Sequence, residues 1–306
     1  MKYLLLYNPV SGKGKFKKKV PFIKKYFAKR NLHLDIYESK APKDLEKKAF
    51  ELSSMYDVFL VSGGDGTINE VINGVMKSST RPSIAVLPSG TANDIAAILG
   101  MNKRVKRTLK IVLNNEPIKM DINQLNNRYF VYTTAAGIIT KISYDIPRAK
   151  VKKLGYLAYV TEGAKDLLND YQIPMEITHD NGVIKGEYML ALALSSTRVG
   201  GMFLTSFSDP CLNDGLLEIR LMKYKRHFKL FKLFKFFFSR GKKNNEDVHI
   251  RSSYYKIKVG QNVVWNTDGE KACQGSVEIN VYKEALNVFV SDKSRKKFFR
   301  KQIIDK

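Results

Sequence analysis

The chain has 306 residues, 44% of them hydrophobic, so it can form one large domain or two of ordinary size. Its 53 Lys and Arg against 29 Asp and Glu give a net charge of +24, which favours an anionic partner: a nucleotide, a nucleic acid or an anionic membrane. Two cysteines exclude a disulfide scaffold and fit a reducing cytoplasm. No apolar run is long enough for a signal peptide or a membrane span, so we expect any work at a membrane to be done from its surface.

The first predicted strand covers residues 3–7 and leads into a glycine turn, Asn8-Pro9-Val10-Ser11-Gly12-Lys13-Gly14. A basic helix to about Arg30, a strand at 32–37 and a helix at 42–54 follow. The turn is either a lysine-rich surface loop or a loop whose backbone N–H groups and Lys13 contact phosphates. We favour the second interpretation, because another glycine loop is predicted at a neighbouring strand end.

That second loop follows a short buried strand at 58–61 and reads Ser62-Gly63-Gly64-Asp65-Gly66-Thr67. A helix begins directly after it. Glycines let a backbone approach a phosphate because no Cβ intervenes, and a helix N-terminus favours an anion. Asp65 in such a turn needs a metal ion or a ribose hydroxyl to balance its charge. The pattern favours a nucleotide site over a plain tight turn.

A further strand at 82–88 ends in Ser89-Gly90-Thr91-Ala92-Asn93-Asp94, where Asn93 or Asp94 could cap the next helix. A helix at 104–113 and a strand at 118–122 complete the first half. Short strands then dominate, which predicts an antiparallel β domain after an open α/β domain. The predicted strands lie at 129–135, 175–178, 188–195, 216–222, 254–259, 263–266 and 277–281, with one helix at about 154–169.

The motif Gly63-Gly64-Asp65-Gly66-Thr67 resembles the signature of the diacylglycerol kinase catalytic domain, whose superfamily also contains sphingosine, ceramide and NAD kinases. The start at residues 8–14 resembles the lipid branch, and the Gly-Ser-Thr-Ala-Tyr stretch of NAD kinases is absent. The resemblance covers nearly the whole chain. It implies a Rossmann-like α/β domain at 1–123 with a C-terminal return at about 286–306, and a β-sandwich domain at 124–285 that completes the active-site cleft.

The resemblance also implies the residues that bind ATP. Ser39 stands where the family usually has threonine, and it keeps the hydroxyl. Asp121 matches an acid of the family's cleft, whereas the usual acid near Ile139 is missing, which leaves the acceptor open. The expected ATP-binding residues are Asn8, Pro9, Ser11, Gly12, Ser39, Gly63, Gly64, Asp65, Gly66, Thr67, Asn69, Glu70 and Thr91.

Phosphoryl transfer to a hydroxyl needs a proton acceptor. The four histidines lie outside every motif. Asp268-Gly269-Glu270 resembles the Asp-Gly-Glu motif in which the family has its proton acceptor. Asp-Gly alone also signals a hairpin turn. We expect Glu270 to be the base, with Asp268 as its rival or co-worker. Burial or a neighbouring acid should make Glu270 more basic.

The stretch at 209–217 resembles a structural magnesium site of bacterial lipid kinases, although Asn-Asp-Gly could also form a plain hairpin turn. Mapped onto this chain, Asp214 supplies its carboxylate, and Cys211 and Leu216 supply backbone carbonyls. One carboxylate with carbonyls and waters suits a hard cation such as Mg²⁺.

The expected function is therefore that of an ATP-dependent lipid kinase, with diacylglycerol as the default acceptor and phosphatidic acid as the product. A sphingoid base, another glycerolipid and a nucleotide-binding regulator without turnover remain alternatives. A nucleic-acid binder is suggested by charge alone, so no specific nucleic acid is expected. The expected partners are ATP, the lipid and an anionic membrane surface, at the inner face of the membrane on the cytoplasmic side. A homodimer stays open.

Residues 224–238 are unusually rich in Phe and Lys. A helix there would place Phe231, Phe234 and Phe238 on one side, with Leu230 and Phe237 beside them. Another side would carry Lys225, Lys229 and Lys232. The helix either packs on the β domain or lies in a membrane interface, with its lysines on anionic headgroups.

Overall fold

The computed structural model describes residues 1–138, 171–207, 210–225 and 229–300, which fall into two compact units. The helix predicted at 154–169 lies outside these residues. The side chains of Lys13, Lys229, Leu230 and Phe234 are also outside the description, although their backbone is included. Unit 1 consists of Met1–Ile122, Cys211–Asp214 and Lys283–Lys306; unit 2 consists of Asn123–Pro210 and Gly215–Tyr282.

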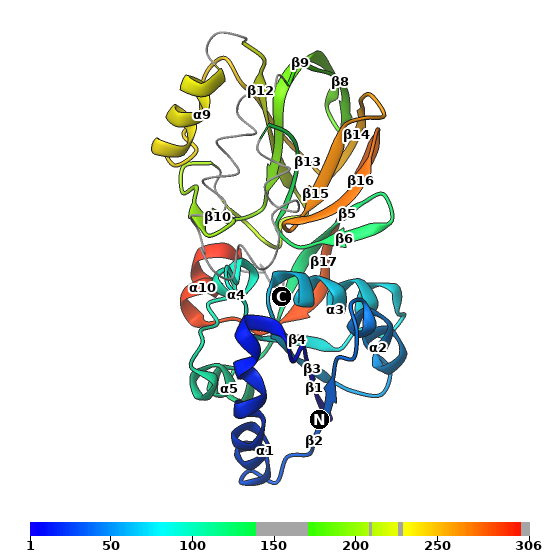
Figure 1. Cartoon of the computed structure of the whole chain (residues 1–306), viewed down its shortest axis with the longest axis vertical. Coiled ribbons are helices and arrows are strands. Elements are labelled where there is room, and N and C mark those ends of the chain that lie inside the picture. The colour runs from blue at the N-terminus through cyan, green and yellow to red at the C-terminus, as the bar shows by residue number, and fades with distance from the viewer. Residues whose placement is uncertain (139–170, 208–209, 226–228, 301–306) are drawn as a thin grey trace, which may run out of the picture. The chain divides into compact units, whose positions relative to one another are not determined.

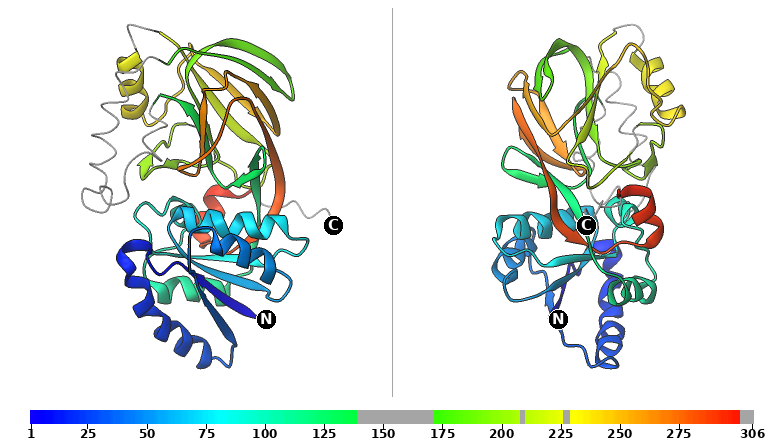
Figure 2. Two further views of the ribbon diagram at one scale, coloured as in Figure 1. Left: turned by 45° about the vertical axis from the view of Figure 1, so that its right-hand side comes forward. Right: turned by 180° about the vertical axis from the view of Figure 1, so that it is seen from behind.

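Unit 1 is built on a parallel sheet with the strand order β2-β1-β3-β4, and the end of β17 pairs with β4. Every residue of β1 and β3 is buried, because helices cover both faces of the sheet. Helices α2 and α3 lie on one face, and α1 and α5 on the other (Figures 1 and 2). The elements are β1 (Tyr3–Tyr7), η1 (Ser11–Lys19), α1 (Val20–Ala28), β2 (Leu34–Glu38), α2 (Asp44–Leu52), β3 (Val58–Gly63), α3 (Asp65–Lys77), β4 (Ser83–Pro88), α4 (Asp94–Ile98), α5 (Val105–Asn114), β5 (Ile118–Leu125), β17 (Val277–Val288) and α10 (Asp292–Phe298).

Unit 2 consists mainly of antiparallel strands in the order β16-β15-β7-β9-β8-β14-β17, with β12 between β9 and β13. Its core includes the fully buried side chains of Phe130, Tyr188, Tyr255 and Trp265. The elements are β6 (Arg128–Phe130), β7 (Thr133–Gly137), β8 (Ile173–His179), β9 (Gly182–Leu194), β10 (Arg198–Val199), β11 (Met202–Phe203), β12 (Leu217–Lys223), α9 (Lys229–Phe238), β13 (Val248–Ser252), β14 (Tyr254–Lys258), β15 (Val264–Thr267) and β16 (Glu270–Gln274).

The predicted succession of a parallel α/β half and an antiparallel half is confirmed. Some elements differ in detail. The single strand predicted at 129–135 is two strands, β6 and β7, and the last strand runs on to Val288. Strands β13 and β16 were not predicted. None of the described helices is long and apolar enough to cross a membrane.

Candidate functional site

The glycine loops of unit 1 follow β1, β3 and β4, and backbone hydrogen bonds join them to one another. The Asn8 N–H donates to the Ser62 carbonyl at 3.0 Å, and the Ser89 and Gly90 N–H groups donate to the Gly63 carbonyl at 3.0 and 3.1 Å. Because the strands are parallel, all three loops leave the sheet at the same edge. In an open α/β sheet this edge is where ligands bind.

Two glycines allow these loops to touch backbone to backbone. Gly12 has φ +57°, and a Cβ at this residue would stand 1.5 Å from the Ser89 carbonyl oxygen. A Cβ on Gly90 would stand 2.4 Å from the Gly64 Cα. At Gly12 and Gly90 the loops therefore meet main chain to main chain, and such glycine loops can bring their N–H groups close to a phosphate.

Replacing Gly12 by Ala should weaken ATP binding at least about tenfold, since the added methyl group must force the first and third loops apart. Isothermal titration with ATP or a non-hydrolysable analogue measures the effect. Gly14→Ala is the matched control: Gly14 also has a positive φ, +69°, but its Cβ would lie 3.4 Å from its nearest neighbour, the Pro9 carbonyl oxygen. Equal ATP affinities in the two variants would contradict the role of the loop contact.

Asp65 is the first residue of helix α3, rather than a loop residue as the sequence suggested. Its Oδ1 accepts a hydrogen bond from the Ile95 N–H at 2.9 Å, so Asp65 caps the first turn of α4 from the start of α3. The Asn93 side chain does not cap α4. It accepts from the Gly90 N–H and donates to the Gly90 carbonyl, both at 2.7 Å, and thereby closes the third loop.

The other expected ATP-binding residues divide between the surface of unit 1 and its interior. Thr91 is exposed, and Ser39 is half-buried with its hydroxyl donating to the Ala41 carbonyl at 3.1 Å. Thr67 and Asn69 are buried, and Asn69 Oδ1 accepts from the Asn73 side chain at 3.0 Å, so it braces the interior of α3. Half-buried positions are held by Asn8, Pro9, Ser11, Gly12, Gly64, Asp65, Gly66 and Glu70.

A hydrogen-bonded pair lies beside Ser39, at the ends of β1 and β2. The Tyr7 hydroxyl donates to Glu38, and burial followed by this bond raises the pKa of Tyr7 to about 12. Hydrogen bonds from Tyr7 and Lys17 lower the pKa of Glu38 below its ordinary value. The Glu38 charge is thus already partnered by protein donors.

The structure gives different environments to the two candidate bases of unit 2. Asp268 is only 4% exposed and accepts hydrogen bonds from the N–H groups of Val131, Tyr132 and Thr133 at 2.7, 3.0 and 3.2 Å. Glu270 is exposed at the start of β16, opposite Thr267 in the β15–β16 hairpin. The burial that we expected at Glu270 is found at Asp268 instead, and Glu270 is the solvent-exposed carboxylate of the two.

The ligands expected around Asp214 are its carboxylate and backbone carbonyl oxygens. Asp214 has a side chain that is 6% exposed, and Arg300 Nη2 lies 3.8 Å from its Oδ2. Burial raises the pKa of the Cys211 thiol, so that side chain stays protonated and is a poor cation ligand. Within the described residues, no cluster of three or more His, Cys, Asp and Glu side chains could hold a metal ion. One carboxylate with backbone carbonyls is a donor set that fits Mg²⁺. A bound Mg²⁺ would compete with the Arg300 guanidinium for the Asp214 carboxylate.

If Asp214 holds Mg²⁺, the melting temperature of the nucleotide-free protein should rise with added Mg²⁺, by about 2–4 °C at tenfold excess over the dissociation constant. Asp214→Ala should melt lower and lose this response. Arg300→Gln is the control, because it removes the competing cation and should keep the response. An unchanged Mg²⁺ response in Asp214→Ala, measured by differential scanning calorimetry, would count against the site.

Comparison with known proteins gives consistent matches. The family model described as the diacylglycerol kinase catalytic domain matches residues 2–125. A diacylglycerol kinase of Bacillus subtilis (strain 168) is 30% identical over 295 residues, which cover 95% of this chain and 97% of the relative. One from Staphylococcus aureus (strain MRSA252) is 31% identical over 221 residues, 72% of this chain and 70% of the relative. The crystal structure of a diacylglycerol kinase from Bacillus anthracis str. Sterne has the same fold, with a TM-score of 0.78 at 24% identity over 95% of this chain and 98% of that chain.

Proposed function

Since the chain belongs to the diacylglycerol kinase catalytic domain family, we propose that it is an ATP-dependent lipid kinase that phosphorylates diacylglycerol to phosphatidic acid. The observation that supports nucleotide binding most directly is the contact of three glycine loops at one edge of a parallel sheet, with Gly12 against Ser89. The near full-length likeness to the Bacillus subtilis diacylglycerol kinase supports the acceptor.

The two halves of the chain have different roles in this proposal. Residues 1–123, with the return at 286–306, bind ATP: backbone N–H groups of the glycine loops hold phosphate oxygens, and Asp65 faces a ribose hydroxyl or a hydrated cation. In residues 124–285, Glu270 takes the proton from the acceptor hydroxyl, and Asp268 holds the backbone of residues 131–133 at the junction between β6 and β7. Mg²⁺, when bound, would neutralise charge on the phosphates.

A kinase assay with labelled ATP and separate lipids in neutral detergent micelles tests this function. Phosphatidic acid should form from diacylglycerol, with slower or no transfer to monoacylglycerol and sphingosine. Faster phosphorylation of sphingosine than of diacylglycerol would show that a sphingoid base is the acceptor instead. ATP binding without transfer to any lipid would overturn the kinase function and leave a nucleotide-binding regulator.

A further inference from the structure

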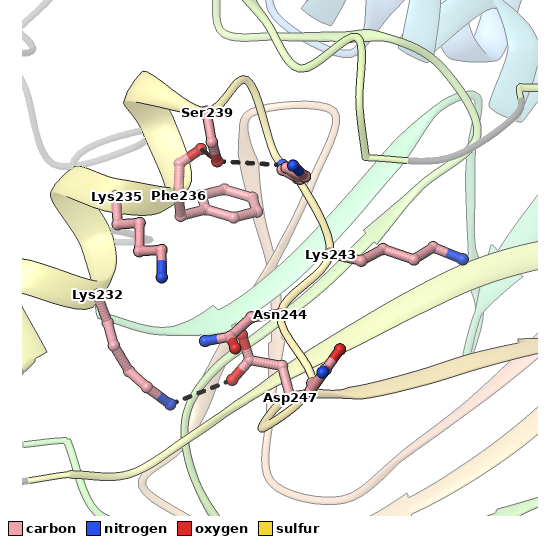
Figure 3. A pocket seen from close by; sticks show the side chains of 9 residues that line it. Lys232, Lys235, Phe236, Ser239, Lys243, Asn244 and Asp247 are labelled. Carbon is pink, nitrogen blue, oxygen red and sulfur yellow. Dashed lines mark hydrogen bonds and ion pairs between the residues drawn. The ribbon is translucent and has the colours of Figure 1, made fainter.

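Unit 2 contains a basic cavity between helix α9 and the loop that follows it. The cavity has a volume of about 240 Å³, well above the roughly 10–15 Å³ that one water molecule needs by this measure. Four lysines line it against a single aspartate, Asp247. Figure 3 shows Lys235 on the helix and Asn244 on the loop facing the space between these two elements.

Asp247, the acid among the described residues that line the cavity, is already neutralised. Lys232 is 9% exposed, and its Nζ lies 3.3 Å from Asp247 Oδ1 and 3.2 Å from Glu246 Oε2. Lys235, Lys242 and Lys243 are exposed, and the described part of the chain gives them no carboxylate partner. Three like charges around one cavity repel one another, so an anion there would be stabilising.

A buried arginine fixes the walls of the cavity. Arg220 of β12 is 1% exposed and donates to the carbonyls of Gly241 and Phe207. Its guanidinium also lies 5.6 Å from the ring centroid of Phe236, on the inner face of α9. Helix and loop are therefore both held against the sheet of unit 2, so the cavity does not need a ligand to form.

The outer face of α9 is aromatic. Phe231 is 66% exposed and Phe238 is 84% exposed, and their spacing around the exposed Lys235 puts all three on one helix face. This differs from the predicted arrangement. Lys225 precedes α9 and pairs with Glu246, and Lys232 is buried, so these two lysines do not form an outward basic face.

We propose that α9 docks on an anionic phospholipid bilayer. Phe231 and Phe238 enter the acyl boundary, and the cavity beside them takes the phosphate of an anionic headgroup such as phosphatidylglycerol. Large exposed aromatics next to unpaired lysines complement this kind of surface, which is apolar inside and negatively charged outside. This inference rests on the proposed function in one respect: docking would bring the enzyme to an acceptor lipid that resides in the membrane.

Sedimentation of the full chain with vesicles tests the docking. The wild type should bind vesicles of phosphatidylcholine with phosphatidylglycerol, and binding should fall with salt and without the anionic lipid. Lys235→Glu with Lys242→Glu should weaken binding at least about 20-fold, since two favourable charges are lost. Phe231→Ser with Phe238→Ser should also weaken it. Lys106→Glu with Lys110→Glu, two exposed lysines of α5, is the control with the same charge change and should have a much smaller effect.

Further measurements separate the lipid from other anions and from the kinase function. If inorganic phosphate raises the melting temperature through Lys235 and Lys242 while vesicle binding ignores both lysines, the cavity is a soluble-anion site and the proposal is overturned. Equal loss of vesicle binding in the Lys106 and Lys110 control would also overturn it, because only net charge would matter. Turnover in neutral detergent should stay within about twofold of wild type in the lysine and phenylalanine variants of α9 and its following loop. A wild type that binds vesicles but phosphorylates no lipid would instead refute the kinase function alone.

Discussion

Glu270→Gln is expected to lower kcat by about 10²–10⁴-fold, the usual loss on removing a general base. ATP affinity and the melting temperature should hardly change. The Glu270 side chain is exposed, and the structure assigns it no hydrogen bond or ion pair within the described residues, so glutamine can replace it without disturbing unit 2. Steady-state and single-turnover kinetics with diacylglycerol in micelles, ATP titration and differential scanning calorimetry measure these three quantities.

Asp268→Asn provides the comparison that decides between the two carboxylates. An asparagine has one acceptor oxygen and an NH2 group that faces N–H donors, so part of the cluster at Val131, Tyr132 and Thr133 loses its partner. The free energy of unfolding should fall by at least about 3 kcal/mol. Should Asp268→Asn stay stable and lose more turnover than Glu270→Gln, the base is Asp268. If neither variant loses turnover, the base lies elsewhere.

The fold was predictable wherever burial follows a simple period. The strands β1, β3 and β4 are continuous apolar runs because helices cover both faces of their sheet, and glycine turns mark where each strand ends. Strand β16 lacked such a signal. It lies at the end of the strand order, and its sequence, Glu-Lys-Ala-Cys-Gln, has no buried face to impose alternation.

The site was predictable only where neighbours in sequence act together. The glycine motifs could be placed at strand ends, but the partner of Asp65 lies 30 residues away, and those of Asp268 lie 135 to 137 residues away. Such contacts depend on the tertiary fold and leave no periodic pattern. The same reason explains the wrong prediction for Lys232. Helical spacing put it on a charged outer face, but it is buried and forms ion pairs with Glu246 and Asp247 of the following loop.

The contact between Asp65 and Ile95 changes what a substitution at Asp65 should do. Asp65→Ala should still abolish phosphoryl transfer, but it also removes the cap of α4, so the free energy of unfolding should drop by about 0.5–2 kcal/mol. An inactive Asp65→Ala protein therefore cannot by itself distinguish a lost charge beside the nucleotide from a displaced α4.

Asp65→Asn separates these two effects. The amide oxygen can still accept the Ile95 N–H at the helix start, since asparagine caps helices about as well as aspartate. Only the negative charge is lost, and with it the interaction with a ribose hydroxyl or a hydrated cation. The melting temperature should stay close to that of wild type, whereas kcat/KM for ATP should fall by about 10²–10³-fold, as when a preorganised electrostatic contact is removed. An Asp65→Asn enzyme with wild-type turnover would show that Asp65 serves only to position α4, and the nucleotide would then have to be held by the glycine loops without it.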